Sequence, residues 1–475
     1  TAQNDQTCPA AAAVRALYPA GTSPFSATQN IRPNGSTNVG LNFNPDGTVF
    51  TNVSPGGLTR FRTPIDGAEW AKTLTLSPQD INGRTISEGV KWNNQEAFAS
   101  APQERYSFFS SGTFEVSDTV EAFARATYAE SKTNTLLFGT SVVSGWEFNV
   151  PYNPTTDSPV NPALDYKNEA TVRSILANPS AFSNPGFIPT GARGANFPVP
   201  LELAVLLNSR ATQNARWQPS WNPEGSLPAR QTTNTNAVWQ IETGLNIDLP
   251  FRDWTAELYY SHGESSTYNN ADGNLSLTRV RTLLNYPDYG RNAAGTGNEF
   301  YTVGTNIGNA QIVPAVRPQF GVGDFKCTSG FYDTLFKGDQ PMSADCFKAI
   351  NATLQTRASN QQDIIEINLQ GSVMELPAGE LRVAGGYQMR DNAAQFVPDI
   401  LQSQDSFTDQ VIGVYPTGYL DASTKVDDYY VEALVPVLNG LPGIQMLELE
   451  LGARYSDYRE TEAQTTWKAL VNWEI

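Results

Sequence analysis

The sequence predicts an all-β protein, an antiparallel up-and-down transmembrane β-barrel of which this chain is a part. Three observations predict it. From Gln103 onward, apolar and polar residues alternate over long stretches. The connections between these stretches are alternately short and long. Charged side chains fall almost wholly in the polar register. Because successive side chains of a strand point to opposite faces of a sheet, each stretch has one apolar and one polar face.

The clearest hairpin begins at Asn236. Between Asn236 and Leu249 every second residue is apolar or small, and after a tight turn at Pro250–Asp253 the alternation continues from Trp254 to Ser261. A strand of about 9–11 residues with this alternation is the length that crosses a bilayer in a tilted barrel. An amphipathic hairpin of a soluble β-sandwich has the same local pattern, so the rest of the chain has to decide between the two.

The alternation predicts nine strands along the chain. They cover residues 103–116, 120–128, 236–249, 254–261, 361–373, 380–390, 429–435, 447–456 and 465–473. The connections Ser117-Asp118, Pro250–Asp253, Leu376–Gly379 and Val437–Gly443 are short, whereas those over about 131–235, 267–360 and 392–425 are long. Alternate connections of a meander lie on the same rim, so one rim has short turns and the other has long loops. Outer-membrane barrels have this asymmetry, with the long loops outside the cell.

The chain divides into two segments by its pattern. Residues 1–102 form a loop-rich segment, with short strands of the barrel near Asn38–Phe43 and Thr48–Asn52. Residues 103–475 form the barrel strands and their extracellular loops. Helix-like pieces interrupt the loops at Glu169–Leu176, Leu201–Leu207 and Ser343–Arg357.

Composition excludes several classes of function. Charged residues make up 17% of the 475 residues, below the roughly 25% of a typical soluble domain. The net charge of −17 argues against a nucleic-acid partner. His262 is the single histidine, which excludes a catalytic or metal site built on several histidines, and we expect neither a metal nor a cofactor. No apolar run approaches the roughly 18 residues of a membrane helix, and a closed barrel needs none.

The cysteines point to an oxidising compartment. Cys327 and Cys346 lie 19 positions apart in a turn-rich segment, a spacing that suits a loop disulfide, although two unpaired thiols remain the alternative. Cys8 is left over. Because the chain starts at Thr1 without a signal peptide and stops at Ile475 inside an alternating run, we expect an internal piece of a longer protein.

Several short stretches resemble one family of membrane proteins. They are Pro102 to Ser107, Leu447 to Tyr458, Val426–Pro436 with Glu432 before a turn at Val435-Pro436, and Cys327 to Gly330 with Asp345-Cys346. In these stretches the chain resembles the barrel of TonB-dependent outer-membrane receptors. The resemblance covers about Gln103 to Ile475.

The resemblance implies a barrel of about 22 strands with a plugged lumen. Such receptors lie in the bacterial outer membrane, bind a scarce ligand at the cell surface and import it with energy passed on by the TonB protein. Their ligands include ferric siderophores, haem, cobalamin and oligosaccharides. The chain departs from the pattern because it has no plug domain, no N-terminal box for TonB and no closing strands. As it stands, this piece has unpaired sheet edges and is not expected to transport alone.

Two other classes of function compete with the receptor. A passive outer-membrane porin would have shorter loops and no plug. A secreted β-rich carbohydrate-binding protein or enzyme is suggested by the acidic pairs Asp427-Asp428 and Glu448/Glu450. Because these carboxylates stand in strands of regular alternation, they are read more simply as groups that line a wet lumen, and the protein is not expected to be an enzyme.

Candidate ligand contacts come from the long loops. Trp146, Trp217, Trp221, Tyr286, Tyr289 and Arg291 are loop aromatics and a cation that would stack on a sugar or hold an anionic chelate, although packing of one loop against another is the simpler role for each. Trp254, Tyr259, Tyr260 and Trp473 are expected at the membrane interfaces, where aromatic residues gather.

Overall fold

The fold is described from a computed structural model of the chain. The structure describes residues 9–17, 41–43, 46–51, 74–77, 89–92, 98, 100–137, 139–140, 150–192, 196–217, 227–295, 325–337, 340–403 and 410–475. The expected contacts Trp146 and Trp221, and the unpaired Cys8, lie outside these residues.

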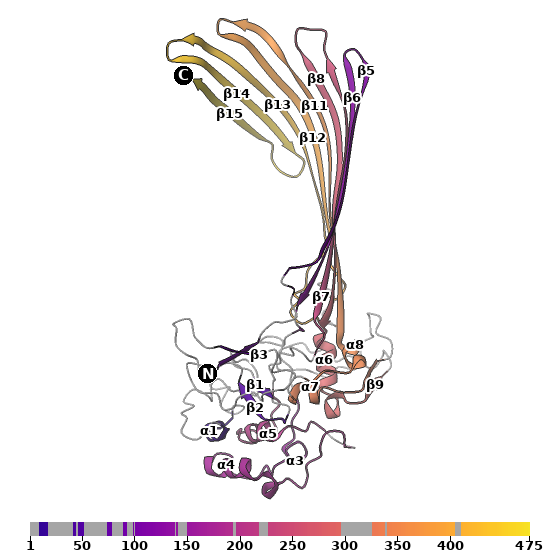
Figure 1. The fold of residues 1–475 in the computed structure, drawn as a ribbon, viewed down its shortest axis with the longest axis vertical. Helices are drawn as coiled ribbons and strands as arrows, with labels where there is room; N and C mark the ends of the chain where they lie inside the picture. The colour runs from indigo at the N-terminus through magenta and orange to yellow at the C-terminus, as the bar shows by residue number, and fades with distance from the viewer. Residues whose placement is uncertain are drawn as a thin grey trace.

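One long antiparallel sheet dominates the structure (Figure 1). Its nine strands are β5 (Gln103–Ser117), β6 (Val120–Leu137), β7 (Arg230–Asp248), β8 (Thr255–Leu275), β11 (Asn351–Leu376), β12 (Gly379–Val397), β13 (Leu420–Leu441), β14 (Ile444–Tyr458) and β15 (Gln464–Glu474). Each strand pairs with the next of these along the chain, so the sheet is an up-and-down meander as the alternation predicted. The sheet is curved but not closed, and β5 and β15 form its two edges.

Most strands extend well beyond the predicted ranges on the long-loop side. β11 has 26 residues and begins at Asn351 rather than near residue 361. β6 continues to Leu137 and β8 to Leu275, so the long connections are shorter than expected. The added parts are rich in small polar residues that pair across strands, such as Asn269, which donates to Asn234 at 2.6 Å. Because neither face is apolar over most of these parts, they lack the alternation that marks a half-buried strand.

Tight turns join the strands at the opposite end. Short connections follow β5, β7, β11 and β13, where short turns were predicted. The prediction of a turn from Val437 to Gly443 was wrong in extent, because β13 continues to Leu441 and β14 begins at Ile444. Pro436 lies inside β13 rather than in a turn, next to a bulge between Pro436 and Leu438. A proline is tolerated there because the ladder to β12 already ends at Leu434.

A compact unit, here called the cap, lies at the long-loop end of the sheet (Figure 1). It consists of the described residues between β6 and β7 and between β8 and β11, with α1, β1 and β2 packed against them. Its helices are α1 (Ala11–Leu17), α3 (Pro154–Asp157), α4 (Glu169–Ala177), η3 (Pro179–Phe182), α5 (Leu201–Asn208), α6 (Leu277–Leu284), η4 (Pro287–Gly290), α7 (Tyr332–Phe336) and α8 (Ala344–Ile350). Buried aliphatic and aromatic side chains from these elements form one continuous core.

The early part of the chain is tied to the cap by polar contacts. The backbone N–H of Val49 donates to the buried carboxylate of Glu202 at 2.6 Å. Arg15 pairs with Glu169 at 2.9 Å. The short hairpin of β1 (Leu41–Phe43) and β2 (Val49–Thr51) stands where two strands were predicted, but it forms a separate two-stranded sheet.

Two of the three predicted helices are confirmed. α4 begins after Asn168, whose side chain accepts from the N–H groups of Ala170 and Thr171, and it buries Val172 and Ile175 on one face. α5 is buried from Glu202 to its end at Asn208. The third prediction, Ser343–Arg357, was wrong in its second half, because the helix ends at Ile350 and β11 follows at once. From Ala352 onward the burial alternates, with Ala352 and Leu354 buried, which is the period of a strand.

Two further small hairpins complete the described elements. β9 (Ala293–Gly295) pairs with β10 (Phe325–Cys327), and β3 (Leu74–Ser77) pairs with β4 (Gly89–Trp92). None of the helices that the structure describes is long and apolar enough to cross a membrane.

Candidate functional site

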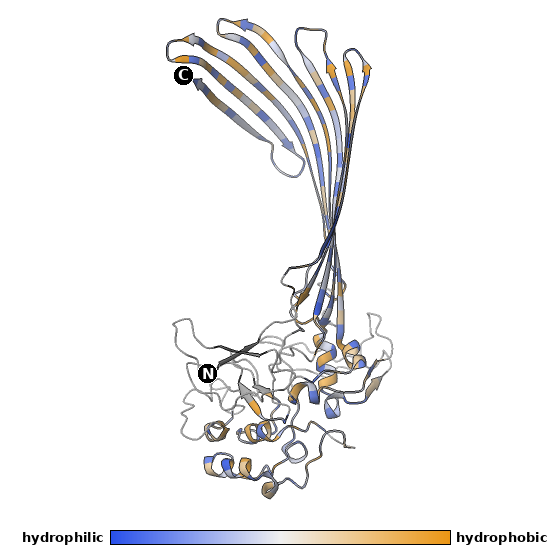
Figure 2. Ribbon diagram, in the orientation of Figure 1, coloured by the Kyte–Doolittle hydropathy of each residue, from blue (hydrophilic) through white to orange (hydrophobic). Residues whose placement is uncertain are grey.

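One face of the sheet carries exposed apolar side chains on all nine strands. The register places Phe108, Tyr128 and Trp239 side by side across β5, β6 and β7. The same face continues through Leu258 and Ile367 on β8 and β11. Its residues are largely exposed, among them Tyr106, Phe114, Ile241, Leu369, Val431, Leu451, Trp467, Val471 and Trp473. Figure 2 shows the alternation along each ribbon. Exposed apolar area on this scale marks a surface that contacts protein or membrane.

This apolar face has no charged residue over a defined band. On β5 the side chains of the apolar register run from Tyr106 to Val116 without a charge, and on β14 they run from Leu447 to Tyr455. The band reaches from the tight turns to about the level of Tyr128 and Tyr260. Its height agrees with the about 9–11 residues that a tilted strand needs to cross a bilayer.

Tyrosines and carboxylates close the band on the side of the cap. The hydroxyl groups of Tyr128, Tyr260 and Tyr387 donate to carboxylates of Glu130, Asp363 and Asp427, at 2.6, 2.8 and 2.5 Å. Each carboxylate lies farther from the tight turns than its tyrosine. Aromatic side chains with one polar end are typical of the boundary between hydrocarbon and water.

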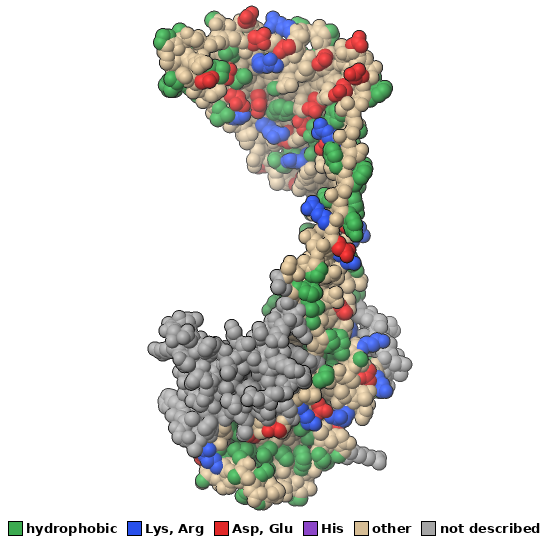
Figure 3. Space-filling model, in the orientation of Figure 1, with side chains coloured by type: hydrophobic (Ala, Val, Ile, Leu, Met, Phe, Trp, Pro, Cys, Tyr) green, Lys and Arg blue, Asp and Glu red, His purple; other side chains and the backbone are tan. Residues whose placement is uncertain are grey.

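The opposite face is a connected network of polar and charged side chains. Glu366 accepts from Tyr259 at 3.0 Å and from Gln388 at 2.6 Å. Arg454 in turn donates to Gln388 at 3.3 Å and lies 3.5 Å from Asp428. Figure 3 shows side chains of both signs gathered on the face of the sheet in view. Within the band, the charged side chains lie on this face and not on the apolar one. Apolar exceptions on the polar face include Phe109 and Leu470, on the two edge strands.

The loop aromatics expected to contact a ligand lie mainly in the core of the cap. Trp217 is 2% exposed and Tyr289 is fully buried. Both rings pack on Phe336, with ring centroids 6.0 and 5.4 Å apart. Both rings are packed inside the core, where the simpler role of packing one loop against another describes them. Burial in a loop core leaves no mark in the sequence that separates such rings from exposed ones.

Tyr286 and Arg291 lie at the edge of the same core. Tyr286 packs against it while half-buried. Arg291 pairs with Asp288 at 3.2 Å and approaches Asp333 at 3.7 Å. Its charge is therefore already matched by two carboxylates, which leaves it a poor partner for an anionic chelate.

Buried polar groups that sequence reasoning missed stabilise the cap. The Arg210 guanidinium is 2% exposed and donates to the backbone carbonyls of Leu207, Gln213, Ala215 and Arg216. Burial lowers its pKa to about 10, so it stays charged at neutral pH. A cation at the end of α5 also complements the helix dipole. Burial raises the pKa of Asp157, which accepts from the backbone N–H groups of Asn153 and Phe197. In the part of the chain that the structure describes, no three metal-ligating side chains gather.

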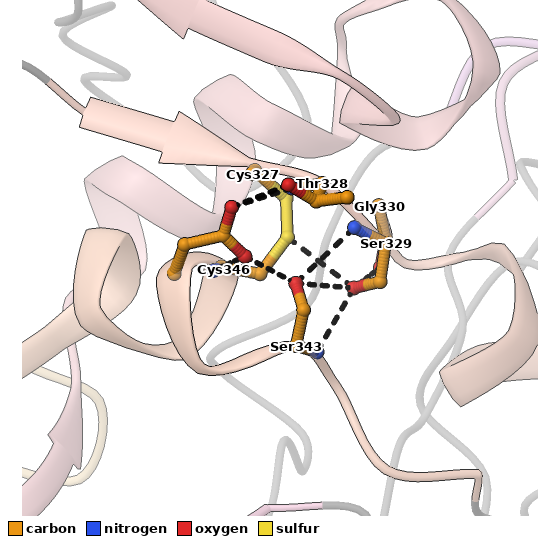
Figure 4. The surroundings of a disulfide bond; sticks show 7 residues. Cys327, Thr328, Ser329, Gly330, Ser343 and Cys346 are labelled. Atoms are coloured by element: carbon orange, nitrogen blue, oxygen red, sulfur yellow. Dashed lines mark hydrogen bonds between the residues drawn. A yellow bond between two sulfur atoms is a disulfide. The ribbon is translucent and has the colours of Figure 1, made fainter.

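The cap contains one disulfide, between Cys327 of β10 and Cys346 of α8 (Figure 4). The Asp345 carboxylate beside it accepts from the hydroxyl groups of Thr328 and Ser343, at 2.6 and 2.5 Å. It also accepts from the backbone N–H of Cys346 at 2.9 Å. Burial alone would raise the pKa of Asp345, but these hydrogen bonds outweigh it and lower the pKa to about 2.

We expect the cap to lose stability at acid pH through Asp345. Its pKa falls from 3.8 to about 2 on folding, so its contribution is complete above pH 4 and is lost as the pH falls toward 2. An Asp345→Asn variant should unfold at a lower temperature at pH 7 and should show a smaller loss between pH 4 and pH 2. Thermal unfolding followed by circular dichroism at several pH values measures both. An equal acid loss in wild type and variant would contradict this role.

Comparison with known proteins adds no identification. No protein-family model matches the chain, and no curated protein matches it.

Proposed function

We propose that this chain is part of the barrel of a TonB-dependent outer-membrane receptor, which imports a scarce ligand such as a ferric siderophore or an oligosaccharide. The observation that carries the proposal is the charge-free apolar band, continuous over nine adjacent strands. Placing an arginine or lysine of such a band at the bilayer midplane would cost about 2–4 kcal/mol, which explains why the band has none. The stretches from Pro102 to Ser107 and from Leu447 to Tyr458 supply the family resemblance.

The open sheet edges fit the same proposal. Backbone groups on the outer edges of β5 and β15 have no strand partner among the described residues. In hydrocarbon an unpaired backbone polar group costs several kcal/mol, so a spanning sheet has to close on itself. Further strands pairing with these two edges would complete the barrel. The polar network around Glu366 and Arg454 would then face a wet lumen.

The strand lengths also favour a receptor over the simplest porin. At about 3.3 Å per residue, a strand as long as β11 spans roughly 85 Å, far more than a hydrocarbon core of about 30 Å. The strands therefore project from the membrane and carry the cap above it. A passive channel does not need a folded cap with its own hydrophobic core, whereas a receptor can use one to capture a ligand selectively.

Localisation and conductance together test the proposal. We expect the protein, as its gene encodes it, to fractionate with the outer membrane and to change electrophoretic mobility on heating, as folded barrels do. Reconstituted in planar bilayers, a plugged receptor should give no steady open channel. A steady ohmic conductance would replace the receptor with a passive porin. Recovery in the soluble fraction would overturn the membrane assignment itself.

A further inference from the structure

A polar groove lies on the sheet between the charged network and the cap. Five strands, β7, β8, β11, β12 and β13, line it, and its volume is about 440 Å³. Side chains of the polar face that border it include Gln240, Ser261, Asn360, Gln362, Asn392 and Thr424. Several of them lie opposite one another in the strand pairing: Gln362 lies opposite Asn392, and Asn392 lies opposite Thr424.

The lining of the groove has almost no charge. None of its residues is a lysine or an arginine. Its one carboxylate, Glu264, belongs to the register of the apolar face, because it pairs with Trp239. The hollow of about 320 Å³ nearer the tight turns is different, because Glu366, Arg454 and Lys468 border it. The polar face therefore changes from charged to uncharged toward the cap.

Carboxamides and hydroxyls supply the hydrogen-bonding groups of the groove. Gln362 Nε2 donates to Asn392 Oδ1 at 2.8 Å, and Gln240 Nε2 donates to Ser261 at 2.9 Å. The amide nitrogen of Asn392 and the side chain of Asn360 have no protein partner within the described part of the chain. Each carboxamide offers both donors and acceptors. Such groups match hydroxyls, which also donate and accept.

We propose that this groove is a binding subsite for an uncharged, hydroxyl-rich ligand, an oligosaccharide rather than an anionic metal chelate. The inference rests on the proposed receptor function and selects between its ligand classes. An anionic chelate calls for arginine or lysine, whose charge-assisted bonds are about twice as strong as neutral ones, and the groove has neither. An apolar ligand calls for a largely hydrophobic lining, whereas the apolar side chains that the polar face contributes here are Val238, Ala394 and Ala422, set among carboxamides and hydroxyls. Its volume falls within the range of about 300–1,000 Å³ common for small-ligand sites.

Binding of defined probes to the outer-membrane protein in detergent tests the subsite. The neutral probes are maltotriose, cellotriose and xylotriose, and the anionic probe is ferric citrate, each measured by calorimetry. We expect at least one trisaccharide to bind and ferric citrate not to bind. A Gln362→Leu/Asn392→Leu variant removes the central carboxamide pair at nearly constant volume. It should weaken trisaccharide binding at least tenfold.

A matched control lies on the other face of β12. Gln395 is exposed, belongs to the apolar register and does not border the groove, so Gln395→Leu should leave binding unchanged. Binding of ferric citrate alone, binding of no probe, or equal binding by the double variant would overturn the proposed ligand class. These outcomes would reject the subsite but not the outer-membrane receptor. Recovery of the protein in the soluble fraction would instead reject the receptor function itself. Outer-membrane yield and heat-dependent mobility show whether each variant folds.

Discussion

Replacing Ile367 by arginine is expected to lower the free energy of unfolding in lipid by about 2–4 kcal/mol. Ile367 stands in the middle of the charge-free band, paired with Leu258 on one side and Tyr387 on the other. Its side chain is 41% exposed, so in the proposed barrel an arginine at this position would face lipid rather than protein. Urea unfolding of the protein from phospholipid vesicles, followed by fluorescence, measures the change.

The polar face of the same strand supplies the control. Gln370 lies three residues along β11, is exposed and belongs to the polar register. Gln370→Arg should change the free energy of unfolding by about 0.5 kcal/mol or less, the usual range for surface substitutions. If both variants lose the same stability, the apolar band does not face lipid. If neither does, the sheet is not embedded in the bilayer.

The sequence was sufficient to predict the sheet wherever its two faces differ. Alternation of Ile365 and Ile367 with Glu366 fixes both the strand and its orientation, because one face avoids water and the other avoids lipid or core. Where polar residues occupy both registers, as from Gln355 to Asn360, the sequence lacks this alternation and the strand was missed. The helix predicted from Ser343 to Arg357 was too long for a related reason. Its first residues are typical of a helix, and nothing in the residues after Ile350 marks the change to extended backbone.

The candidate site was harder to predict than the fold. Trp217 and Tyr289 looked like ligand contacts because they are aromatic residues in polar loops, yet the cap has a core of its own that buries them. The groove was missed because Gln362 and Asn392 are unremarkable in their own strands. Only the register shows that uncharged polar residues on five strands adjoin one another. That grouping depends on pairing between strands far apart in sequence, which one chain's local pattern does not contain.

Loss of the Cys327–Cys346 disulfide is expected to destabilise the cap by about 3 kcal/mol, from the loop-closure entropy of a loop of this size. The bond joins β10 to α8, and α8 leads directly into β11. Cutting it therefore loosens the point at which the cap is fixed to the sheet. In a Cys346→Ser variant, amide hydrogen exchange in α7 and α8 should quicken roughly a hundredfold, since about 1.4 kcal/mol corresponds to a factor of ten.

The strands of the sheet are an internal reference for that measurement. Amides of β12 from Val383 to Met389 pair with both β11 and β13 and lie away from the cap, so their exchange should not change. A Cys327→Ser/Cys346→Ser variant should match the single variant and should not respond to a reducing agent, whereas the wild-type protein should. Equal acceleration in α8 and β12 would mean that cap and sheet unfold as one unit. Unchanged exchange in α8 would mean that the hydrogen bonds of Asp345 and the buried core around Phe336 hold the cap without the disulfide.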